Sequence, residues 1–370
     1  MTSMAIREDI APADHLIEQR PDLESQVIES LSQTPYKCLS LEQLSGGIAN
    51  FTFRGSLYLP LQDNRKSVII KHSLSCEKTG VLDLPVIRCA GEAVSLEVMR
   101  GILFKHEHVS IRSPHPLYLD THANIQVMED IPNVGTLRDN LYLDKTTSQS
   151  TAICIGESLG LWLGEFHSRD WSHVDEDVMA TIRENTAALS MGGLHLHFMM
   201  DAFHDDLLAK ESVSKLFSQN HNDRRSILHG DFSTRNFLLQ SHQENNKKND
   251  INLVLVDWEL CRYGCVAEDL ASMIACLYTQ WMLEDTPSAE FILRGFIRGY
   301  GQLSEHLIFR LAGLIPVYLV IWGKFDVIIG EKSEARTREL HRHARDFLVG
   351  AAQRDVKWLS QSCLSEFLRG

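Results

Sequence analysis

Long hydrophobic runs, paired cysteines and an excess of positive charge are all missing from this chain of 370 residues. No apolar run reaches the roughly 18 residues that a transmembrane helix needs, and residues 1–22 contain no apolar segment typical of a secretory signal. The eight cysteines include no CxxC pair, which argues against a disulfide framework and favours free thiols in a reducing compartment. We therefore expect a cytoplasmic protein.

The charge balance limits the partners of the protein. Lys and Arg number 36 against 49 Asp and Glu, a formal net charge of −13. A nucleic-acid or anionic membrane surface needs clustered Lys and Arg, so we expect neither partner. An anionic small ligand stays compatible with this balance, because one lysine or metal ion can reverse the local field. The sequence does not indicate an oligomeric state.

The order of the predicted elements indicates two lobes. Strand patterns with one helix occupy the first third of the chain, a Pro/Gly segment follows, and helical patterns dominate the rest apart from an island of two short strands. We therefore predict an α+β fold with a small β-rich N-lobe and a larger, mainly helical C-lobe. The predicted parts are an N-terminal extension (1–25), the N-lobe (26–130) and the C-lobe (131–370). The predicted elements are strands at 44–59, 67–72, 124–131, 237–239 and 251–257, and helices at 91–104 and 151–167.

A polar stretch, "HGDFSTRN" (229–236), lies between two apolar segments. Asp231 and Asn236 are five positions apart, the spacing of the catalytic base and the metal-binding asparagine in phosphoryl-transfer loops. A carboxylate can receive the proton of an attacking hydroxyl, and an amide oxygen can bind Mg²⁺ without competing as a base. Arg235 would contact a phosphate or the carboxylate of Asp231. The alternative interpretation is an ordinary polar turn.

The run "LVLVD" (253–257) predicts a buried strand that ends in a carboxylate. A buried carboxylate is costly unless it is paired or bound to a metal, so Asp257 is our main candidate for a Mg²⁺ ligand. Glu259 projects to the same side as Asp257 if the extended backbone continues. It would then hold a second ion or an ordered water, or else be a solvent-exposed acid.

Lys71 follows "SVII" on a predicted strand and shares a face with the core residue Ile69. It would bind the phosphates of a nucleotide or a glutamate on the predicted helix 91–104, although an exposed strand-end lysine is also compatible. Glu92 is the preferred partner because it lies on the same helical face as Leu96, whereas Glu97 lies elsewhere around the helix.

A glycine turn precedes the lysine strand in "LSGGIANFTFRG" (44–55), although it does not match GxGxxG. Backbone N–H groups in such a turn can bind phosphates, and a serine hydroxyl can assist. The strand end "VMEDI" (127–131) offers backbone groups to an adenine ring. The candidate nucleotide-binding residues are Ser45, Gly46, Gly47, Asn50, Glu129 and Ile131.

Taken together, "LGLWLGEFH", "HGDFSTRN" and "VDWELCRYGCVAEDLA" resemble the aminoglycoside phosphotransferase and choline kinase superfamily. Within it, "LSGGIANFTFRG", "SVIIKH" and "DWELCRYG" are most similar to the methylthioribose kinase-like branch, which includes fungal hydroxytryptamine kinases of secondary metabolism. The resemblance spans roughly residues 25 to 350 and implies a bilobal protein-kinase-like fold. It implies ATP with Mg²⁺ as phosphate donor and the hydroxyl of a small molecule as acceptor.

The resemblance also implies a role for each matching residue. Asp231 would be the catalytic base, Asn236 and Asp257 would bind Mg²⁺ with Glu259 as a further ligand, and Lys71 would contact ATP phosphates. Glu92 would orient Lys71, and Asp269 would have a structural role. A nucleotide-binding pseudokinase without transfer activity is the alternative. A protein kinase is disfavoured, because "DWE" stands where DFG is expected and no APE follows.

The acceptor is expected to bind among the helices of the C-lobe. Trp322 and Asp326, together with Arg235, are the candidate acceptor contacts. An aromatic wall with an acid would suit an amine, although aromatic residues in such helices also serve as core. The sequence leaves open whether the acceptor is a sugar, an indole or an amino alcohol.

Overall fold

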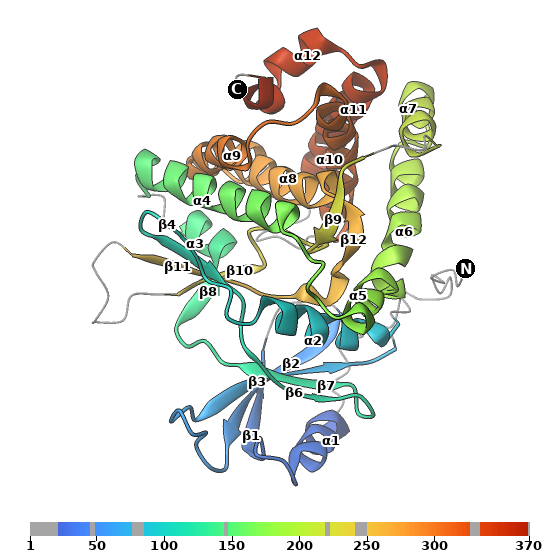
Figure 1. The fold of residues 1–370 in the computed structure, drawn as a ribbon. Helices are drawn as coiled ribbons and strands as arrows, with labels where there is room; N and C mark the ends of the chain where they lie inside the picture. The colour runs from blue at the N-terminus through green and yellow to red at the C-terminus, as the bar shows by residue number, and fades with distance from the viewer. Residues whose placement is uncertain are drawn as a thin grey trace.

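A five-stranded antiparallel sheet forms the smaller lobe of the computed structural model, which describes residues 21–44, 49–75, 85–143, 147–218, 223–240, 250–325 and 334–368. Helix α1 (Pro21–Leu31) packs on this sheet, and helix α2 (Ile87–Met99) lies between it and the larger lobe (Figure 1). In sheet order the strands are β1 (Cys38–Gln43), β2 (Asn50–Leu57), β3 (Ser67–Ser73), β7 (Ile125–Glu129) and β6 (Pro116–Asp120).

The lobe begins earlier than the sequence predicted. Leu23, Val27 and Leu31 of α1 are buried in the same core as the strands. Their spacing of four places them on one face of the helix, and that face covers the sheet. Residues 21–25, which we had assigned to an N-terminal extension, are therefore part of the N-lobe.

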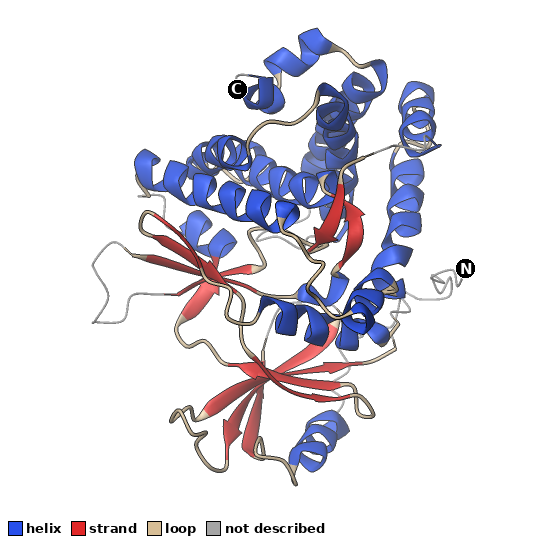
Figure 2. Ribbon diagram, viewed as in Figure 1, coloured by secondary structure: helices blue, strands red, loops and turns tan. Residues whose placement is uncertain are grey.

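A second five-stranded sheet lies between the smaller lobe and the helices of the larger one (Figure 2). Its strands in order are β4 (Phe104–His106), β5 (Val109–Arg112), β11 (Ile251–Leu255), β10 (Phe237–Gln240) and β8 (Val134–Thr136). Strands β10 and β11 correspond to the predicted island of two short strands and pair antiparallel, and β5 pairs with β11 in parallel. The segment 104–112 thus pairs with C-lobe strands, although it falls inside the predicted N-lobe range.

The predicted helix 91–104 begins and ends earlier than expected. Helix α2 stops at Met99, and Gly101 adopts a left-handed conformation with φ of 75°. Such a residue commonly follows the end of a helix. Leu103, which falls within the predicted helix range, lies beyond the helix and is exposed.

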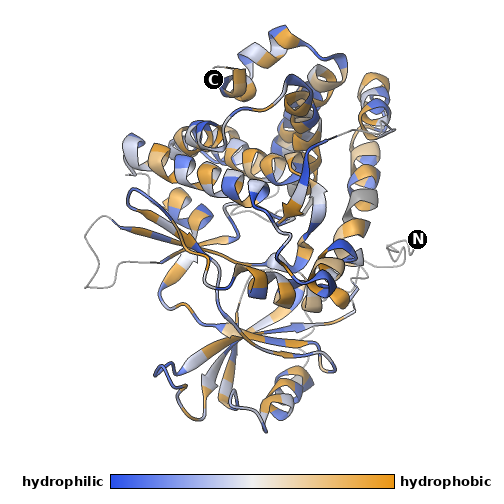
Figure 3. Cartoon of the chain, viewed as in Figure 1, coloured by the Kyte–Doolittle hydropathy of each residue, from blue (hydrophilic) through white to orange (hydrophobic). Residues whose placement is uncertain are grey.

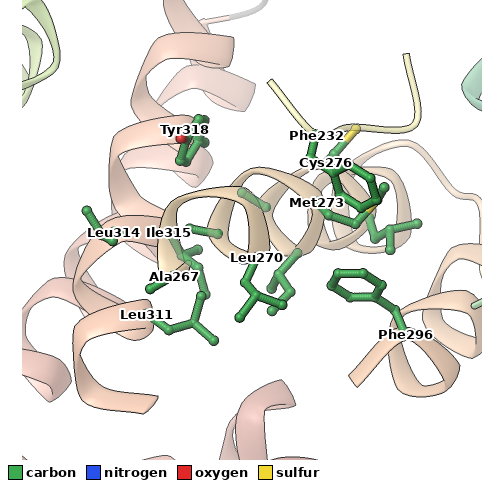
Figure 4. Close-up of a cluster of buried hydrophobic side chains, with 14 of the residues drawn as sticks. Phe232, Ala267, Leu270, Met273, Cys276, Phe296, Leu311, Leu314, Ile315 and Tyr318 are labelled. Carbon is green, nitrogen blue, oxygen red and sulfur yellow. The ribbon is translucent and has the colours of Figure 1, made fainter. Parts of the chain in front are cut away.

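Helices dominate the larger lobe, as predicted. Hydrophobic residues gather on α8 and α10 (Figure 3), and the side chains of α8 pack against Phe232, Phe296 and α10 (Figure 4). A short pair of strands, β9 (Arg225–Leu228) and β12 (Arg262–Cys265), lies beside them. The helices are α3 (Leu137–Leu143), α4 (Gln149–Ser168), α5 (Glu176–Arg183), α6 (Thr186–Ala202), α7 (Leu207–Ser218), α8 (Ala267–Leu283), α9 (Pro287–Tyr300), α10 (Glu305–Phe325), α11 (Glu334–Gln353) and α12 (Val356–Gln361).

Over the residues described above, the structure has no helix that is both long enough and apolar enough to span a bilayer.

Glycines let helices α4 and α9 pack closely. A Cβ atom on Gly156 would lie 2.1 Å from the carbonyl oxygen of Ile292, and one on Gly160 would lie 2.2 Å from that of Phe296. Real Cβ atoms do not approach backbone so closely, so these two positions require glycine. Gly164 has more room, because its nearest neighbour, the carbonyl oxygen of Tyr300, would be 3.3 Å away.

We expect Gly160→Ala to destabilise the protein by about 1–3 kcal/mol, the usual cost of overpacking. The added methyl group would meet backbone atoms of α9, which cannot yield without moving the helix. Gly164→Ala is the matched control, because any small clash there is offset by a gain in helix propensity of about 1 kcal/mol. Urea denaturation measures both changes. Equal urea concentrations at the midpoint of unfolding for the two variants would contradict this packing.

Candidate active site

The loop after β9 is held in place by a buried carboxylate on helix α8. Asp269 accepts hydrogen bonds from the backbone N–H of His229 at 2.8 Å and of Gly230 at 2.9 Å. His167 of α4 lies 3.3 Å from the same carboxylate. The structural role expected for Asp269 is thus a specific one, since it fixes the backbone immediately before Asp231.

The His229 imidazole connects this loop to the strand that carries Asp257. Its Nδ1 accepts from the backbone N–H of Asp231 at 3.2 Å, and its Nε2 therefore donates to the carbonyl of Val256 at 3.0 Å. Burial lowers the pKa of His229, which agrees with the neutral tautomer that this pair of contacts requires. A neutral, buried imidazole is a rigid link between the two segments.

Two residues of the site adopt left-handed backbone conformations. Gly230 has φ of 90°, and a Cβ atom there would lie 2.1 Å from the carbonyl oxygen of Leu260. Asp257 has φ of 70°, which is uncommon for a residue other than glycine. The extended backbone therefore ends at Asp257, and a 3₁₀ turn, Trp258–Leu260, follows.

Asp231 and Asn236 lie side by side in the loop. The Asn236 Nδ2 donates to the Asp231 carboxylate at 2.9 Å and to the Asp231 carbonyl at 2.8 Å. The amide oxygen of Asn236 remains as the acceptor atom of that side chain. The backbone carbonyl of Asn236 accepts from the N–H of Val256 at 2.9 Å, so the loop and the Asp257 strand form one unit.

Lys71 of β3 is bound by carboxylates from both lobes. Its Nζ lies 2.7 Å from Glu92 of α2 and 2.6 Å from Asp257. The pairing with Glu92 agrees with the helical phase of that residue, whereas the direct contact with Asp257 was not anticipated. The Asp257 side chain keeps 30% of its surface exposed, so a further ligand can reach it.

The charges of this cluster depend on one another. Burial alone would lower the pKa of Lys71, but the carboxylates of Asp257 and Glu92 outweigh it and raise that pKa. Burial alone would raise the pKa of Asp257, but Lys71 overcomes it and lowers that pKa. For Glu92, burial prevails and raises the pKa. The result is an ammonium group beside an ionised, accessible carboxylate, which suits an anionic ligand with a divalent cation.

Glu259 occupies a different environment from the one predicted. Because a turn follows Asp257, the expected extended projection is wrong, and Glu259 is buried rather than solvent-exposed. Its Oε2 accepts from Asn50 Nδ2 at 2.7 Å and lies 3.3 Å from Nε of Arg88. Burial and the nearby Asp257 raise the pKa of Glu259 to about 8. Glu259 therefore connects the turn that follows Asp257 to the N-lobe.

Sequence reasoning missed Arg88 in this contact. Its guanidinium is fully buried and donates to the carbonyls of Ala49 and Leu74 at 3.0 and 2.8 Å, and to Asn50 Oδ1 at 3.1 Å. A signal was available, because Arg88 precedes Glu92 by one helical turn on the same face. An arginine on a buried helical face requires an acid and several acceptors.

The Asn50 side chain, a candidate for ATP binding, is thus occupied by Arg88, by Glu259 and by Ser73, whose hydroxyl donates to it at 2.8 Å. Any phosphate contact at this position would use its backbone. The preceding candidates lie outside the described residues: Ser45, Gly46 and Gly47.

The remaining candidates are paired, buried or half-buried, or are not described. The backbone N–H of Glu129 donates to His115, and its carboxylate binds Arg112 at 2.8 Å, while Ile131 is buried. Arg235 is half-buried, and its charge opposes the effect of burial on the pKa of Cys276 in α8. The other two acceptor candidates fall where the structure gives no side-chain information. Trp322 belongs to α10, but its side chain is not described, and Asp326 lies beyond the described end of that helix.

Comparisons of sequence find kinases and phosphotransferases among the proteins similar to this chain. The ecdysteroid kinase-like family model matches residues 173–291. Phosphotransferase FrzJ of Cladobotryum sp is 27% identical over 323 residues, which cover 80% of this chain and 83% of the relative. The 4-hydroxytryptamine kinase of Psilocybe cyanescens is 23% identical over 294 residues, covering 77% of this chain and 81% of the relative.

Comparisons of structure agree on the fold. Amicoumacin kinase hAmiN, solved in complex with AMP-PNP, Ca²⁺ and Ami, gives a TM-score of 0.53 at 12% identity, with 89% of this chain and 94% of that chain covered. A mutant aminoglycoside 2'-phosphotransferase-IIIa with GDP gives 0.51 at 13% identity, with 93% and 95% covered. The protein-kinase-like fold predicted from the motifs is confirmed, and the chain is similar in sequence to fungal kinases and in fold to amicoumacin kinase and aminoglycoside phosphotransferase.

Proposed function

We propose that this protein is an ATP-dependent kinase that transfers the γ-phosphate of MgATP to a hydroxyl group of a small metabolite. The observation that carries the proposal is the placement of Lys71 between Glu92 and Asp257, next to a loop that presents Asp231 and Asn236. These five side chains are the parts that phosphoryl transfer requires. An intact set of this kind favours transfer activity over the pseudokinase alternative.

Asn236 and Asp257 would hold Mg²⁺. The donor set fits, because an amide oxygen and an accessible carboxylate are ligands that this ion prefers, and Asp257 is held by Lys71 through only one of its oxygens. Bound Mg²⁺ supplies positive charge that offsets the negative charge of the phosphates. Glu259 would join as a direct ligand through its Oε1, since its Oε2 is bound to Asn50.

Asp231 would act as the catalytic base. Asn236 orients its carboxylate, and the bonds from His229 and Gly230 to Asp269 fix the backbone that carries it. In the reaction, the acceptor O–H bond breaks and the carboxylate of Asp231 receives the proton. The acceptor oxygen forms the new bond to the γ-phosphorus, while the bond from that phosphorus to the bridging oxygen of ATP breaks and ADP leaves. Lys71 would meanwhile bind the phosphates from the N-lobe side.

The nucleotide base would bind at the end of β7, through the carbonyl of Glu129 and the N–H of Ile131. The glycine turn at Ser45, Gly46 and Gly47 would cover the phosphates. These contacts, and the acceptor contacts of Arg235, Trp322 and Asp326, stay predictions.

The relatives make a hydroxylated amine the first acceptor to try. Purified protein with MgATP should be incubated with amino alcohols, sugars and hydroxyindoles, and mass spectrometry should detect a product that has gained one phosphate. We expect at least one hydroxylated amine to react. The proposal fails if nothing in the panel reacts and Asp231→Asn leaves ATP hydrolysis unchanged.

Glu259→Gln tests whether Glu259 binds the metal directly. We expect the half-saturating Mg²⁺ concentration to rise by at least about tenfold, because replacing a direct carboxylate ligand with a neutral amide should cost at least the roughly 10- to 100-fold seen for outer-shell partners. The glutamine can still accept from Asn50, so the contact between the lobes persists. Mg²⁺ titrations of activity in both proteins provide the measurement, and a change of less than about threefold would show that Glu259 is not a ligand.

A further inference from the structure

Three side chains of different chemistry meet at the turn between β4 and β5, far along the sheet from Asp257. Glu107 and His108 form this turn, and Cys154 comes from the first part of helix α4. The Cys154 Sγ lies 3.5 Å from Glu107 Oε2 and 3.8 Å from His108 Nδ1, and the last two atoms are 3.9 Å apart. The three potential ligand atoms therefore form a nearly equilateral triangle.

This triangle has the size of one face of a metal tetrahedron. Zinc bonds of about 2.3 Å to sulfur and about 2.0–2.2 Å to nitrogen and oxygen place tetrahedral ligand atoms about 3.3–3.6 Å apart. The Cys154–Glu107 separation of 3.5 Å lies within this range. The other two, 3.8 and 3.9 Å, exceed it by a few tenths of an ångström, which small rotations of the partly exposed His108 and Glu107 side chains can close. A thiol–carboxylate hydrogen bond alone would account for Glu107 and Cys154, but not for His108 Nδ1 at the same point.

We propose that Glu107, His108 and Cys154 form a zinc site that joins the β4–β5 turn to helix α4. A thiolate with an imidazole suits zinc, whereas Mg²⁺ and Ca²⁺ prefer sites made of oxygen atoms alone. The Glu107 side chain is 65% exposed, so the fourth position opens to water. This site is independent of the proposed function.

Proton release accompanies binding at this site. Burial, followed by the adjacent Glu107, raises the pKa of Cys154 to about 11. The sulfur therefore carries a proton in the absence of metal, and the S–H bond breaks when the sulfur–zinc bond forms, with the proton leaving to solvent. Zinc binding should accordingly tighten as the pH rises.

The position of the site suggests what it stabilises. The carbonyl of His108 accepts from the N–H of Ile251 at 2.8 Å, at the start of β11. Strand β11 runs parallel to β5 and leads to Asp257 at its other end. Zinc would therefore fix helix α4 to the beginning of the strand that carries Asp257, and its contribution would be to stability.

Cobalt substitution in the full-length protein tests the site, because Co²⁺ bound to a thiolate has a strong charge-transfer absorption. We expect one equivalent of Co²⁺ to produce this band, Zn²⁺ to abolish it, and excess Mg²⁺ to leave it unchanged. Metal bound at Asp257 and Asn236 gives no such band, since their ligand atoms are oxygen. The two sites, and the two proposals, are thereby distinguished.

Three variants complete the test. Cys154→Ser should lose the band, whereas Cys38→Ser, which removes another buried thiol, should keep it. His108→Ala lies in a surface turn, so its folding is not at risk, and it should weaken Zn²⁺ binding by at least about tenfold. A band that persists in Cys154→Ser, or Zn²⁺ affinity unchanged in His108→Ala, would overturn the proposal, as would the absence of a band in the wild type.

Discussion

Replacing Asp231 with asparagine should lower kcat by roughly 10²- to 10⁴-fold, the contribution of a positioned general base. The asparagine oxygen can still accept from Asn236 Nδ2, which lies 2.9 Å from the Asp231 carboxylate. The shape of the loop should therefore persist while the ability to receive a proton is lost. Steady-state kinetics with the acceptor found in the panel provide the measurement, and the KM for ATP should change by less than about threefold.

The control for Asp231 is Asp205→Asn, which removes one carboxylate from the surface. The Asp205 side chain is 91% exposed, so this variant should match the wild type in kcat. A kcat within threefold of the wild type for Asp231→Asn would show that Asp231 is not the base. An increase in KM at constant kcat would instead indicate a role in binding.

Asp257→Asn should raise the half-saturating Mg²⁺ concentration by at least about tenfold and lower kcat/KM by about 10²-fold or more. Two effects add here. The variant removes the negative charge of a proposed metal ligand, and it leaves Lys71 with a single carboxylate partner. Activity measured across a Mg²⁺ titration separates the metal requirement from the maximal rate.

Glu92→Gln is the matched control for Asp257→Asn. It also deprives Lys71 of a carboxylate, 2.7 Å away, but it changes no proposed metal ligand. We expect it to reduce activity while leaving the half-saturating Mg²⁺ concentration within about threefold of the wild type. If both variants shift the Mg²⁺ requirement equally, Asp257 acts through Lys71 and not as a ligand.

The local parts of the site could be predicted because each has a short sequence signal. The spacing of Asp231 and Asn236 and the strand that ends at Asp257 both appear within a few residues. Helical phase was sufficient to prefer Glu92 over Glu97 as the partner of Lys71, and the two charged groups do meet. Gly156 and Gly160 are a further local signal, because small residues four positions apart lie on one face of a helix and permit a close neighbour.

Contacts between distant segments had no such signal. Periodicity reports which face of an element is buried, but not which element covers it. The burial of Glu259 by Asn50 and Arg88 depends on a left-handed residue at Asp257, which turned the chain away from its extended direction. The boundary predicted at residue 26, between the N-terminal extension and the N-lobe, differs from the structure for a related reason. The contact of α1 with the sheet makes it part of the lobe, and that contact leaves no local signal in the sequence.

The sequence by itself determined the two-lobed α+β fold, the order of the motifs and the chemistry of the side chains that the site would need, because these follow from local periodicity, spacing and residue type. Only the tertiary structure decided that Lys71 contacts Asp257, that Asp269 anchors the loop before Asp231, and that Glu107, His108 and Cys154 converge on one point. Each of these contacts joins residues about 40 or more positions apart. Such contacts are set by how the lobes and helices pack, and packing is a property of the whole chain.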